Sequence, residues 1–417
     1  MSTAPRYDLY SHEFRRSTHE TYARMRDESP MHRQPGLDGE TPIWFVTRYD
    51  DVVALLTDNE RFVLDPALAL TPEELASLNA GGPALDPRVN ENLLSKDGDD
   101  HRRLRRLVTK AFTPRIVEGL RPRIAEIADE LIDRVADRGR MELVDDFAFP
   151  LPITVIAELL GIPVEDQARF REWSNTFVTP ALTPELQEHA MRHTEEFIAY
   201  LDDLFAGRRA EPKDDLVSAL VRAEDKGDHL SENELYSMVV LLIVAGHETT
   251  VSLVTNAVHA LLTDPAQLDA LRSDPSLVST AVEELLRFDS PVERTITRWV
   301  TADVELGGAQ LSRGDLVIAV VGSANRDEAR FPRPDGLDLS RTDNKHVGFG
   351  RGPHFCLGAP LARLETEIAL TTLLQRLPDL RLAIAPDDLY WRPIPIFRSL
   401  TSLPVEWVPR ARSRGSR

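Results

Sequence analysis

The segment from Phe349 to Gly358 holds the single cysteine of this 417-residue chain, in the order Phe-Gly-Arg-Gly-Pro-His-Phe-Cys-Leu-Gly. One cysteine excludes an intrachain disulfide and a zinc site made of four thiolates. An apolar stripe with Pro360 in its first turn predicts a helix from about Ala359 to Leu377. Cys356 then lies at a helix N-terminus, where the helix dipole and free N–H groups stabilise a thiolate.

The glycines of this segment allow a flat ring system to approach the thiolate, because glycine has no Cβ. Haem iron is the metal ion that takes one cysteine as its axial ligand. Taken alone, a cysteine before a helix is more often a small buried hydrophobe, so a structural residue remains an alternative. A dinucleotide-binding fingerprint at Gly348-x-Gly350 is rejected, since no apolar strand precedes it and Pro353 occupies the third glycine position.

The complete pattern Phe-x-x-Gly-x-x-x-Cys-x-Gly resembles the haem-binding loop of the cytochrome P450 monooxygenases, and the run CLGAPLARLE is similar to their soluble bacterial branch. The resemblance extends from about Tyr7 to Trp407. It implies one domain over residues 1–417, mainly α with small β-sheets, with haem b between a long central helix and the cysteine loop. It also implies that Cys356 binds the iron and that the cofactor contacts Phe349, Gly350, His354 and Gly358.

Composition and charge limit the class of partner. Hydrophobic residues make up 42% of the chain, enough for a sizeable core, and the net charge of −19 argues against nucleic acid or an anionic membrane as partner. The polar N-terminus lacks a signal-peptide apolar region, and the longest apolar run, 238–245, is far shorter than the ~20 residues of a membrane helix. We expect a cytoplasmic monomer whose basic tail, 410–417, is disordered.

A capping box, Ser231-Glu-Asn-Glu234, predicts a helix that continues to about Leu262 and spans roughly 45 Å. Its middle, Ala245-Gly-His-Glu-Thr-Thr250, opposes helix propensity, because a glycine inside a helix costs about 1 kcal/mol relative to alanine. A local violation of this kind is typical of a functional site, although an ordinary helix kink would explain the six residues equally well.

The family resemblance places this motif over the distal face of the haem, with Ala245 and Gly246 at the cofactor. It implies that Gly246 opens a groove for dioxygen, that Thr249 offers a hydroxyl there, and that Glu248 belongs to the proton supply. Splitting dioxygen requires two protons, so an acid beside an alcohol makes chemical sense. His247 is expected to be structural.

His101 and Arg105 lie four residues apart in a predicted helix and therefore share one helix face. On their own they indicate a solvated basic face. The resemblance implies instead that they bind the haem propionates, together with Arg298 and His354. Where the family has Asp-Pro-Pro before the histidine this chain has Asp-Gly-Asp, at 97–99, which leaves the geometry of that turn open.

The resemblance implies two further groups of residues. Glu284 and Arg287 would ordinarily form a weak surface pair, but the family buries this pair and adds a third member, here Arg341, in support of the cysteine loop. The region 64–96 is expected to close over the substrate. The substrate pocket is expected to be mostly apolar and to contain Leu93, Leu94, Leu241, Val244, Val292, Ile396 and Phe397.

The predicted function is that of a haem-thiolate monooxygenase, which inserts one oxygen atom of O2 into an apolar small molecule by hydroxylation or epoxidation. The resemblance is nearest to macrolide and other secondary-metabolite hydroxylases, and xenobiotic conversion is a further possibility. No flavin fingerprint occurs in the chain, so electrons are expected from NAD(P)H through a ferredoxin reductase and a ferredoxin. The docking face is expected to include Arg102, Arg103, Arg106, Lys110 and Arg363.

Two alternatives remain open at this point. A peroxide-driven haem-thiolate peroxygenase would need no electron donor, although the pair Glu248-Thr249 favours the oxygen-activating enzyme. A haem sensor without turnover is the second alternative. NADPH consumption with a ferredoxin and a screened substrate would separate the sensor from both enzymes. The identity of the substrate cannot be read from the sequence, because terpenoids and steroids would suit a mostly apolar pocket equally well.

Overall fold

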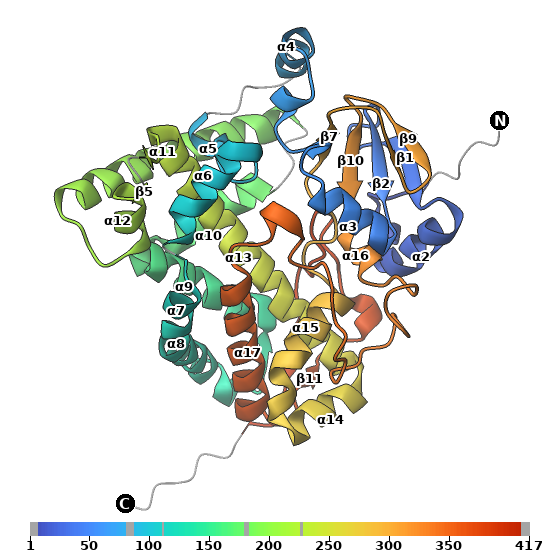
Figure 1. Ribbon diagram of the computed structural model, residues 1–417. Helices are drawn as coiled ribbons and strands as arrows, with labels where there is room; N and C mark the ends of the chain where they lie inside the picture. Colours follow the sequence, from blue (N-terminus) through green and yellow to red (C-terminus); the bar gives the residue numbers. More distant parts are fainter. Residues whose placement is uncertain (1–6, 81–86, 111, 179–182, 226–227, 410–417) are drawn as a thin grey trace, which may run out of the picture.

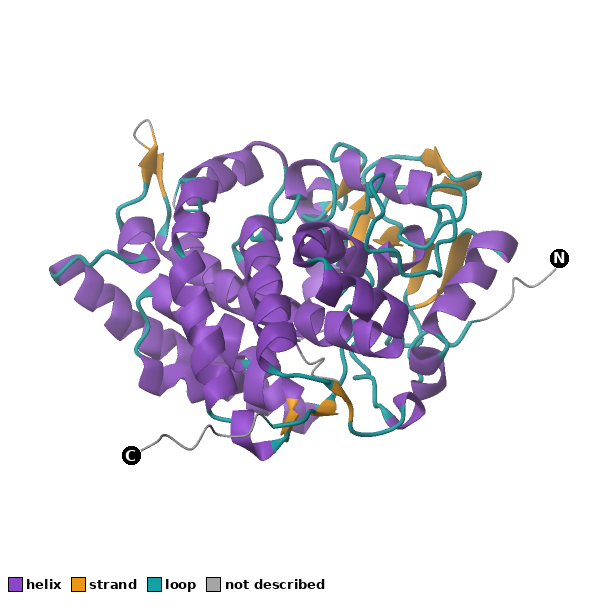
Figure 2. Cartoon of the chain, turned by 90° about the horizontal axis from the view of Figure 1, so that it is seen from below, coloured by secondary structure: helices purple, strands orange, loops and turns teal. Residues whose placement is uncertain are grey.

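The longest helix, α13 (Glu232–Thr263), crosses the interior of the molecule and is surrounded by other helices (Figure 1). This computed structural model describes residues 7–80, 87–110, 112–178, 183–225 and 228–409. The expected disorder of 410–417 therefore lies outside the described residues. Helices prevail and the strands form small separate groups at the periphery (Figure 2), so the expected fold class, mainly α with small β-sheets, is confirmed.

The other α-helices precede or follow α13 in this order: α1 (His12–Arg16), α2 (Thr18–Glu28), α3 (Tyr49–Thr57), α4 (Pro72–Ala80), α5 (Pro87–Asn90), α6 (Gly98–Thr109), α7 (Pro114–Gly119), α8 (Arg121–Asp133), α9 (Pro150–Leu160), α10 (Gln167–Val178), α11 (Pro184–Ala210), α12 (Leu216–Val221), α14 (Pro265–Ser273), α15 (Val278–Phe288), α16 (Val321–Ala324) and α17 (Ala359–Arg376). A π-helical turn, Val144–Ala148, precedes α9.

The largest sheet has five strands in the order β1-β2-β10-β7-β3. Only the β2–β10 pair in it is parallel, with Leu316 opposite Ile43. The strands of this sheet are β1 (Met31–Pro35), β2 (Pro42–Val46), β3 (Phe62–Val63), β7 (Arg298–Val300) and β10 (Leu316–Ala319); a second sheet, β11-β12-β4, contains β4 (Arg140–Glu142), β11 (Arg381–Leu382) and β12 (Pro404–Glu406); two hairpins contain β5 (Glu224–Asp225), β6 (Asp228–His229), β8 (Val304–Leu306) and β9 (Ala309–Leu311).

α13 and α17 begin and end close to where the sequence predicts. The capping box is present, because the Ser231 hydroxyl accepts from the Glu234 N–H and the Glu234 carboxylate accepts from the Ser231 N–H. α17 carries proline in its first turn, as expected, and ends at Arg376. The region 64–96 contains only the short helices α4 and α5 and one 3-10 turn, and part of it, 81–86, is not described.

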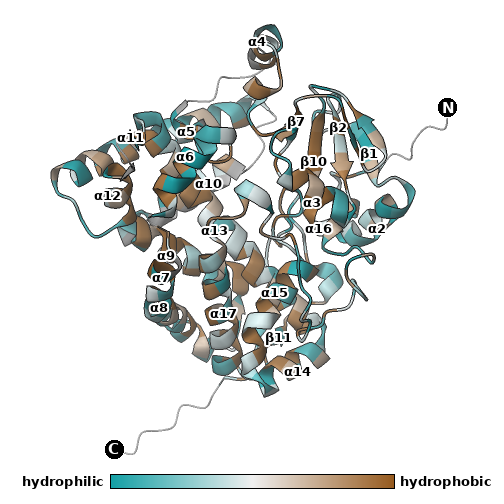
Figure 3. Ribbon diagram, in the orientation of Figure 1, coloured by the Kyte–Doolittle hydropathy of each residue, from teal (hydrophilic) through white to brown (hydrophobic). Residues whose placement is uncertain are grey.

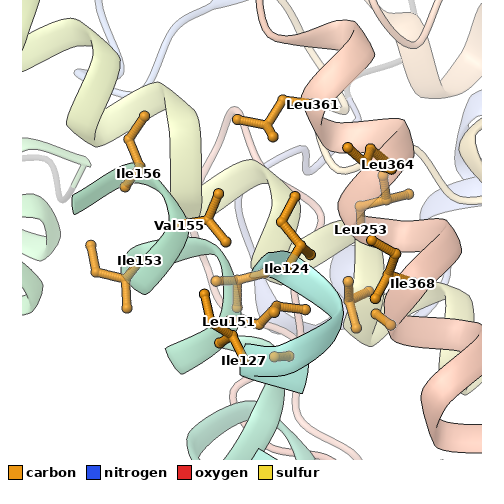
Figure 4. Close-up of a cluster of buried hydrophobic side chains, with 14 of the residues drawn as sticks. Ile124, Ile127, Leu151, Ile153, Val155, Ile156, Leu253, Leu361, Leu364 and Ile368 are labelled. Atoms are coloured by element: carbon orange, nitrogen blue, oxygen red, sulfur yellow. The ribbon is translucent and has the colours of Figure 1, made fainter. Parts of the chain in front are cut away.

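The main core lies where α8, α9, α13 and α17 pack together (Figure 4). Leu253 of α13, Leu364 of α17 and Ile124 of α8 meet there, and Figure 3 shows the same apolar character along α13 and β10. By length and composition α13 could cross a membrane, but 72% of its apolar window is buried inside the protein. It is therefore the core helix that the other helices enclose.

Candidate functional site

A cavity of about 400 Å³ lies between α13 and the cysteine loop before α17. Glu248 does not line it. The lining contains every other haem-contacting, catalytic or pocket residue expected from the sequence: Leu93, Leu94, His101, Arg105, Leu241, Val244, Ala245, Gly246, Thr249, Val292, Arg298, Phe349, Gly350, His354, Cys356, Gly358, Ile396 and Phe397.

A second hollow, of about 540 Å³, lies among α7, α8, α9 and α12 and is far less suited to a cofactor. Two of its charged side chains are already bound, Arg123 to Glu158 at 2.8 Å and Asp215 to Arg208 at 2.5 Å. The first cavity, in contrast, contains buried nitrogen atoms without a hydrogen-bond partner, at His101 and Arg298. Because an unpaired buried donor is costly, these two nitrogens indicate that an anionic group binds there.

The cysteine loop is a tight backbone cradle. The Cys356 N–H donates to the Phe349 carbonyl at 2.9 Å, and Gly350 and Gly352 have φ angles of 73° and 71°. A Cβ on Gly352 would lie 2.7 Å from the Leu56 carbonyl oxygen, closer than such atoms approach. Glycine is therefore required at this position both for its backbone conformation and for the close contact with α3.

The surroundings of the Cys356 thiol shift its pKa in opposite directions. Burial raises its pKa, while N–H groups of Gly358 and Ala359 and the positive charge of Arg105 act in the other direction. These N–H groups stand at the start of α17, as the sequence predicts. A bound metal ion deprotonates a coordinating thiol outright, so the sulfur is a suitable single ligand for iron.

A cluster of cationic and imidazole groups lines the cavity beside the cysteine loop. The rings of His101 and His354 lie 4.0 Å apart, and Arg298 donates to the Phe62 carbonyl at 3.1 Å while its Nε has no partner. Burial, and then the charges of His354 and Arg105, lower the pKa of His101 to about 4. An anionic ligand would reverse that shift. The donor set fits haem b, whose two propionates need such groups at one edge.

Asp97 stands behind this cluster and was not expected from the sequence. Its Oδ1 lies 3.1 Å from His354 Nε2, and its Oδ2 accepts from the N–H groups of Leu64 and Asp65. Burial opposes ionisation, yet these hydrogen bonds hold the pKa of Asp97 below its ordinary value. Gly98 has a φ of 57°, which proline cannot adopt. The turn before His101 therefore differs from one built on Asp-Pro-Pro.

The middle of α13 is a continuous helix and not an opened groove. The Thr249 hydroxyl donates to the Ala245 carbonyl at 2.8 Å, and the helix runs without interruption through both residues. Gly246 instead allows close packing, because a Cβ there would lie 3.3 Å from Ile156 of α9. His247 is buried and bonds to the Ile243 carbonyl at 2.7 Å, in keeping with the structural role expected for it.

Glu248 points away from the cavity, which the sequence did not predict. Its carboxylate forms an ion pair with Arg392, and its Oε2 lies 4.0 Å from His247 Nε2. The carboxylate is almost fully buried, with 4% of the residue exposed. Arg392 lies 144 positions further along the chain, so no local pattern could have identified it.

Glu284, which is fully buried, is the centre of an ion cluster. It lies 2.8 Å from Arg287 and 3.0 Å from Arg341, and Asn344 also donates to it at 3.1 Å. Arg287 in turn donates to three backbone carbonyls between 325 and 336. The cluster therefore fixes the irregular chain that leads to the cysteine loop, and it does so without lining the cavity.

The arginines expected at a docking face are partly engaged. Arg103 pairs with Glu234 at the start of α13, Arg363 binds Glu283 at 2.6 Å, and Arg102 pairs with Asp99 while its side chain stays 65% exposed. The face is therefore less cationic than the sequence suggests, because intramolecular carboxylates neutralise part of it.

A family model for Cytochrome P450 matches residues 39–378. The chain belongs to the cytochrome P450 family. Cytochrome P450 107B1 of Saccharopolyspora erythraea is 46% identical over 415 residues, which cover 97% of this chain and 99% of that protein. The mycinamicin IV hydroxylase/epoxidase of Micromonospora griseorubida is 45% identical over 391 residues, or 93% and 94% of the two chains. The crystal structure of myxobacterial cytochrome P450 CYP267B1 in complex with myristic acid superposes with a TM-score of 0.91 at 47% identity, over 97% and 99%.

As a cytochrome P450, the protein is a haem b monooxygenase that receives electrons from redox partners and oxidises small molecules. The donor set of the cavity agrees with that cofactor. The two alternatives, a peroxide-driven enzyme and a haem sensor, find no support among these relatives.

Proposed function

We propose that this cytochrome P450 hydroxylates or epoxidises a neutral, apolar polyketide of the macrolide type in secondary metabolism. One observation carries the substrate class. Among its described residues, the cavity lining contains no aspartate, glutamate or lysine. Its arginines are Arg105, Arg298 and Arg351, and these three belong to the cationic cluster or to the cysteine loop. The similarity to the mycinamicin IV hydroxylase/epoxidase supports the same class.

The distal wall supports the choice of an uncharged substrate. Leu93, Leu241, Val244, Ile296 and Phe397 present apolar surface, and the polar groups among them are threonine hydroxyls. A carboxylate or ammonium group would lose its hydration there without gaining a partner of opposite charge. The volume next to α13 therefore suits a molecule that binds by apolar area and shape.

Roles for individual residues complete the proposal. Cys356 is the iron ligand, and His101, Arg105, Arg298 and His354 hold the propionates. Haem bound in this way supplies the activation of dioxygen. Thr249 offers its hydroxyl oxygen to the cavity while its proton is donated to the Ala245 carbonyl.

Glu248 requires a change of partner before it can supply a proton. The carboxylate is held by Arg392 on the far side of α13, so it must exchange that ion pair for a hydrogen bond toward the cavity. Arg392 thus becomes a residue of the proton supply, because the strength of its ion pair decides how readily Glu248 is released. The partners are a ferredoxin and its reductase, and the protein acts as a cytoplasmic monomer.

Paired ligands test the substrate class. The haem-loaded protein is titrated with uncharged macrolactones and with the ring-opened hydroxy acid of each lactone, while the haem absorption band reports displacement of water from the cavity. We expect the lactones to bind and to be oxidised when ferredoxin, reductase and NADPH are added, and the acids to bind at least about tenfold more weakly. Equal binding of lactone and acid, or preferred binding of acids, would contradict the proposal.

A further inference from the structure

Two irregular segments of the chain, 291–297 and 394–398, form one wall of the cavity. Neither contains a strand apart from an isolated bridge between Val292 and Phe397. The backbone bonds between the two segments run from the Glu293 N–H at 2.9 Å and the Arg294 N–H at 3.3 Å to the Ile396 carbonyl, and from the Arg398 N–H to the Pro291 carbonyl at 2.8 Å. Because so few backbone hydrogen bonds join the two segments, the position of the wall depends mainly on side-chain interactions.

The wall has two chemically different faces. Val292, Ile396 and Phe397 are half-buried and line the cavity. Glu293, which follows Val292, is 1% exposed and points to the opposite side, where the N-terminal helices pack. A buried carboxylate next to a substrate-facing residue is costly unless it is paired, so its partner has a strong influence on this wall.

That partner is Arg15 of α1, nearly 280 residues away in the chain. Arg15 Nη1 lies 2.8 Å from Glu293 Oε2, and Nη2 donates to the Ile394 carbonyl at 2.5 Å. Nη1 also lies 3.5 Å from the Phe397 carbonyl oxygen. One planar guanidinium therefore joins both segments of the wall, which the single ammonium of a lysine could not do in the same geometry.

The same helix is itself fixed from behind. Arg398 Nη1 donates to the Arg15 carbonyl at 2.8 Å, and the second oxygen of Glu293 accepts from the hydroxyl of Tyr22 in α2. Arg294 donates to that hydroxyl at 2.7 Å. Side chains of α1 and α2 therefore donate to the wall, and side chains of the wall donate to α1 and α2. A shift of α1 would displace the wall.

We infer that Arg15 is a specificity-positioning residue: through Glu293 and the carbonyls of Ile394 and Phe397, the N-terminal helix α1 sets the position of the substrate-facing side chains Val292, Ile396 and Phe397. Arg15 itself does not line the cavity. The inference rests on the proposed function only for the class of substrate that contacts the wall. Its test does not depend on that class, so it can fail while the proposed function holds.

The test compares two buried arginines in the haem-loaded protein, Arg15→Met and Arg208→Met. Arg208 is a matched control, because it is also buried and binds a carboxylate, Asp215, and a backbone carbonyl, Gly161, but neither of these partners belongs to the wall. We expect Arg15→Met to speed hydrogen exchange in peptides covering 291–297 and 394–398 at least several-fold. Arg208→Met should leave hydrogen exchange in these peptides unchanged, even where it lowers the melting temperature as much as Arg15→Met does.

A pair of haem ligands adds a functional readout. Imidazole is the smaller of the two, whereas 4-phenylimidazole carries an additional ring that occupies more of the cavity and is therefore more sensitive to the position of its wall. We expect Arg15→Met to lower the ratio of the 4-phenylimidazole affinity to the imidazole affinity several-fold. In Arg15→Lys this ratio should lie between those of Arg15→Met and the wild type. Unchanged exchange and an unchanged ratio would overturn the inference, as would equal changes in the Arg208 control.

If Arg15→Met folds poorly, hydrogen exchange in the wild-type protein still tests the inference. The amides of Glu293 and Arg398 should exchange as slowly as those in the middle of α13, although their segments lack regular structure. Rapid exchange of these amides in the wild type would mean that α1 does not fix the wall, and would overturn the inference without any variant.

Discussion

Glu365 of α17 is a buried carboxyl group with neither oxygen bonded, and it lies about one helical turn after Ala362, which lines the cavity. Burial raises its pKa to about 8, opposed only in part by the nearby Thr250 hydroxyl, which itself lines the cavity. The group is therefore neutral in the folded protein at neutral pH, whereas in the unfolded chain it is ionised. The folded state holds a proton that unfolding releases.

This difference predicts how stability depends on pH. Between about pH 4.5, the ordinary pKa, and pH 8, the raised pKa, the folded protein binds the extra proton, so the free energy of unfolding falls as pH rises. Glu365→Gln should remove a slope of about 1 kcal/mol per pH unit and make the protein more stable at pH 8. Denaturant unfolding at a series of pH values measures this.

A matched control for Glu365 lies two residues further along the same helix. Glu367 is half-buried and 3.6 Å from Arg121, and the slope that Glu365→Gln removes should persist in Glu367→Gln. Parallel curves for the wild type and Glu365→Gln would show that the carboxyl group is ionised in the folded protein.

Thr249 and Glu248 differ in position, and their variants should differ in effect. Thr249 lines the cavity, so Thr249→Ala should still bind substrate and consume NADPH while more of that flux leaves as hydrogen peroxide. We propose that Glu248 supplies protons from outside the cavity, so Glu248→Gln should slow the whole cycle by about 10²-fold or more. Product, peroxide and NADPH are measured together. A fully coupled Thr249→Ala would mean that another group directs the protons.

Much of the site can be predicted from short sequence patterns, because Cys356, His101, Arg105 and Thr249 stand in motifs of fixed spacing. The partners that complete it cannot. Asp97 meets His354 across 257 positions, and Glu248 meets Arg392 across 144. Such pairs form only after the chain has packed, and no periodicity marks them.

At the scale of elements, the cysteine loop depends on Gly352 being free of a side chain. Gly352→Ala would combine a strained positive φ with a contact to the Leu56 carbonyl oxygen, a fixed backbone atom of α3. We expect a loss of about 3 kcal/mol or more and faster loss of haem, since the loop must move away from α3. Unfolding curves and haem transfer to an acceptor protein measure the two effects.

Gly39 provides the comparison for this loop. Its φ of 76° is equally unusual, but nothing lies within 4 Å of a Cβ placed there, so Gly39→Ala should cost only about 1 kcal/mol and leave haem binding unchanged. Equal costs at the two positions would show that the contact with α3 is easily relieved.

Long elements with defined ends are easier to predict than the shortest ones. α13 and α17 have apolar stripes, a capping box or a proline start, which act locally. β3 and β11 have two residues each, and the wall segments 291–297 and 394–398 are held by a single bridge. The partners of these segments lie elsewhere in the chain, as β7 does for β3 and Arg15 for Glu293, so local propensity carries little signal for them.

At the scale of the whole molecule, the net charge of −19 and the local arginines of α6 act in opposite directions on an acidic electron carrier. The screening length is about 30 Å at 0.01 M salt and about 8 Å at physiological ionic strength. At very low salt the acidic molecule repels the carrier over its whole surface, whereas at moderate salt only the nearby arginines are felt.

The rate of reduction by an acidic ferredoxin should therefore rise and then fall as salt increases, with the maximum where repulsion is screened but the local contact is not. Arg102→Glu should lower the maximum several-fold, because the side chain is 65% exposed on α6. Arg24→Glu on α2, 63% exposed and also paired within its helix, changes the net charge equally and should shift the curve without lowering its maximum. Stopped-flow reduction over a range of salt concentrations separates the two effects. If both variants lower the maximum alike, the carrier responds to total charge and α6 is not its docking site.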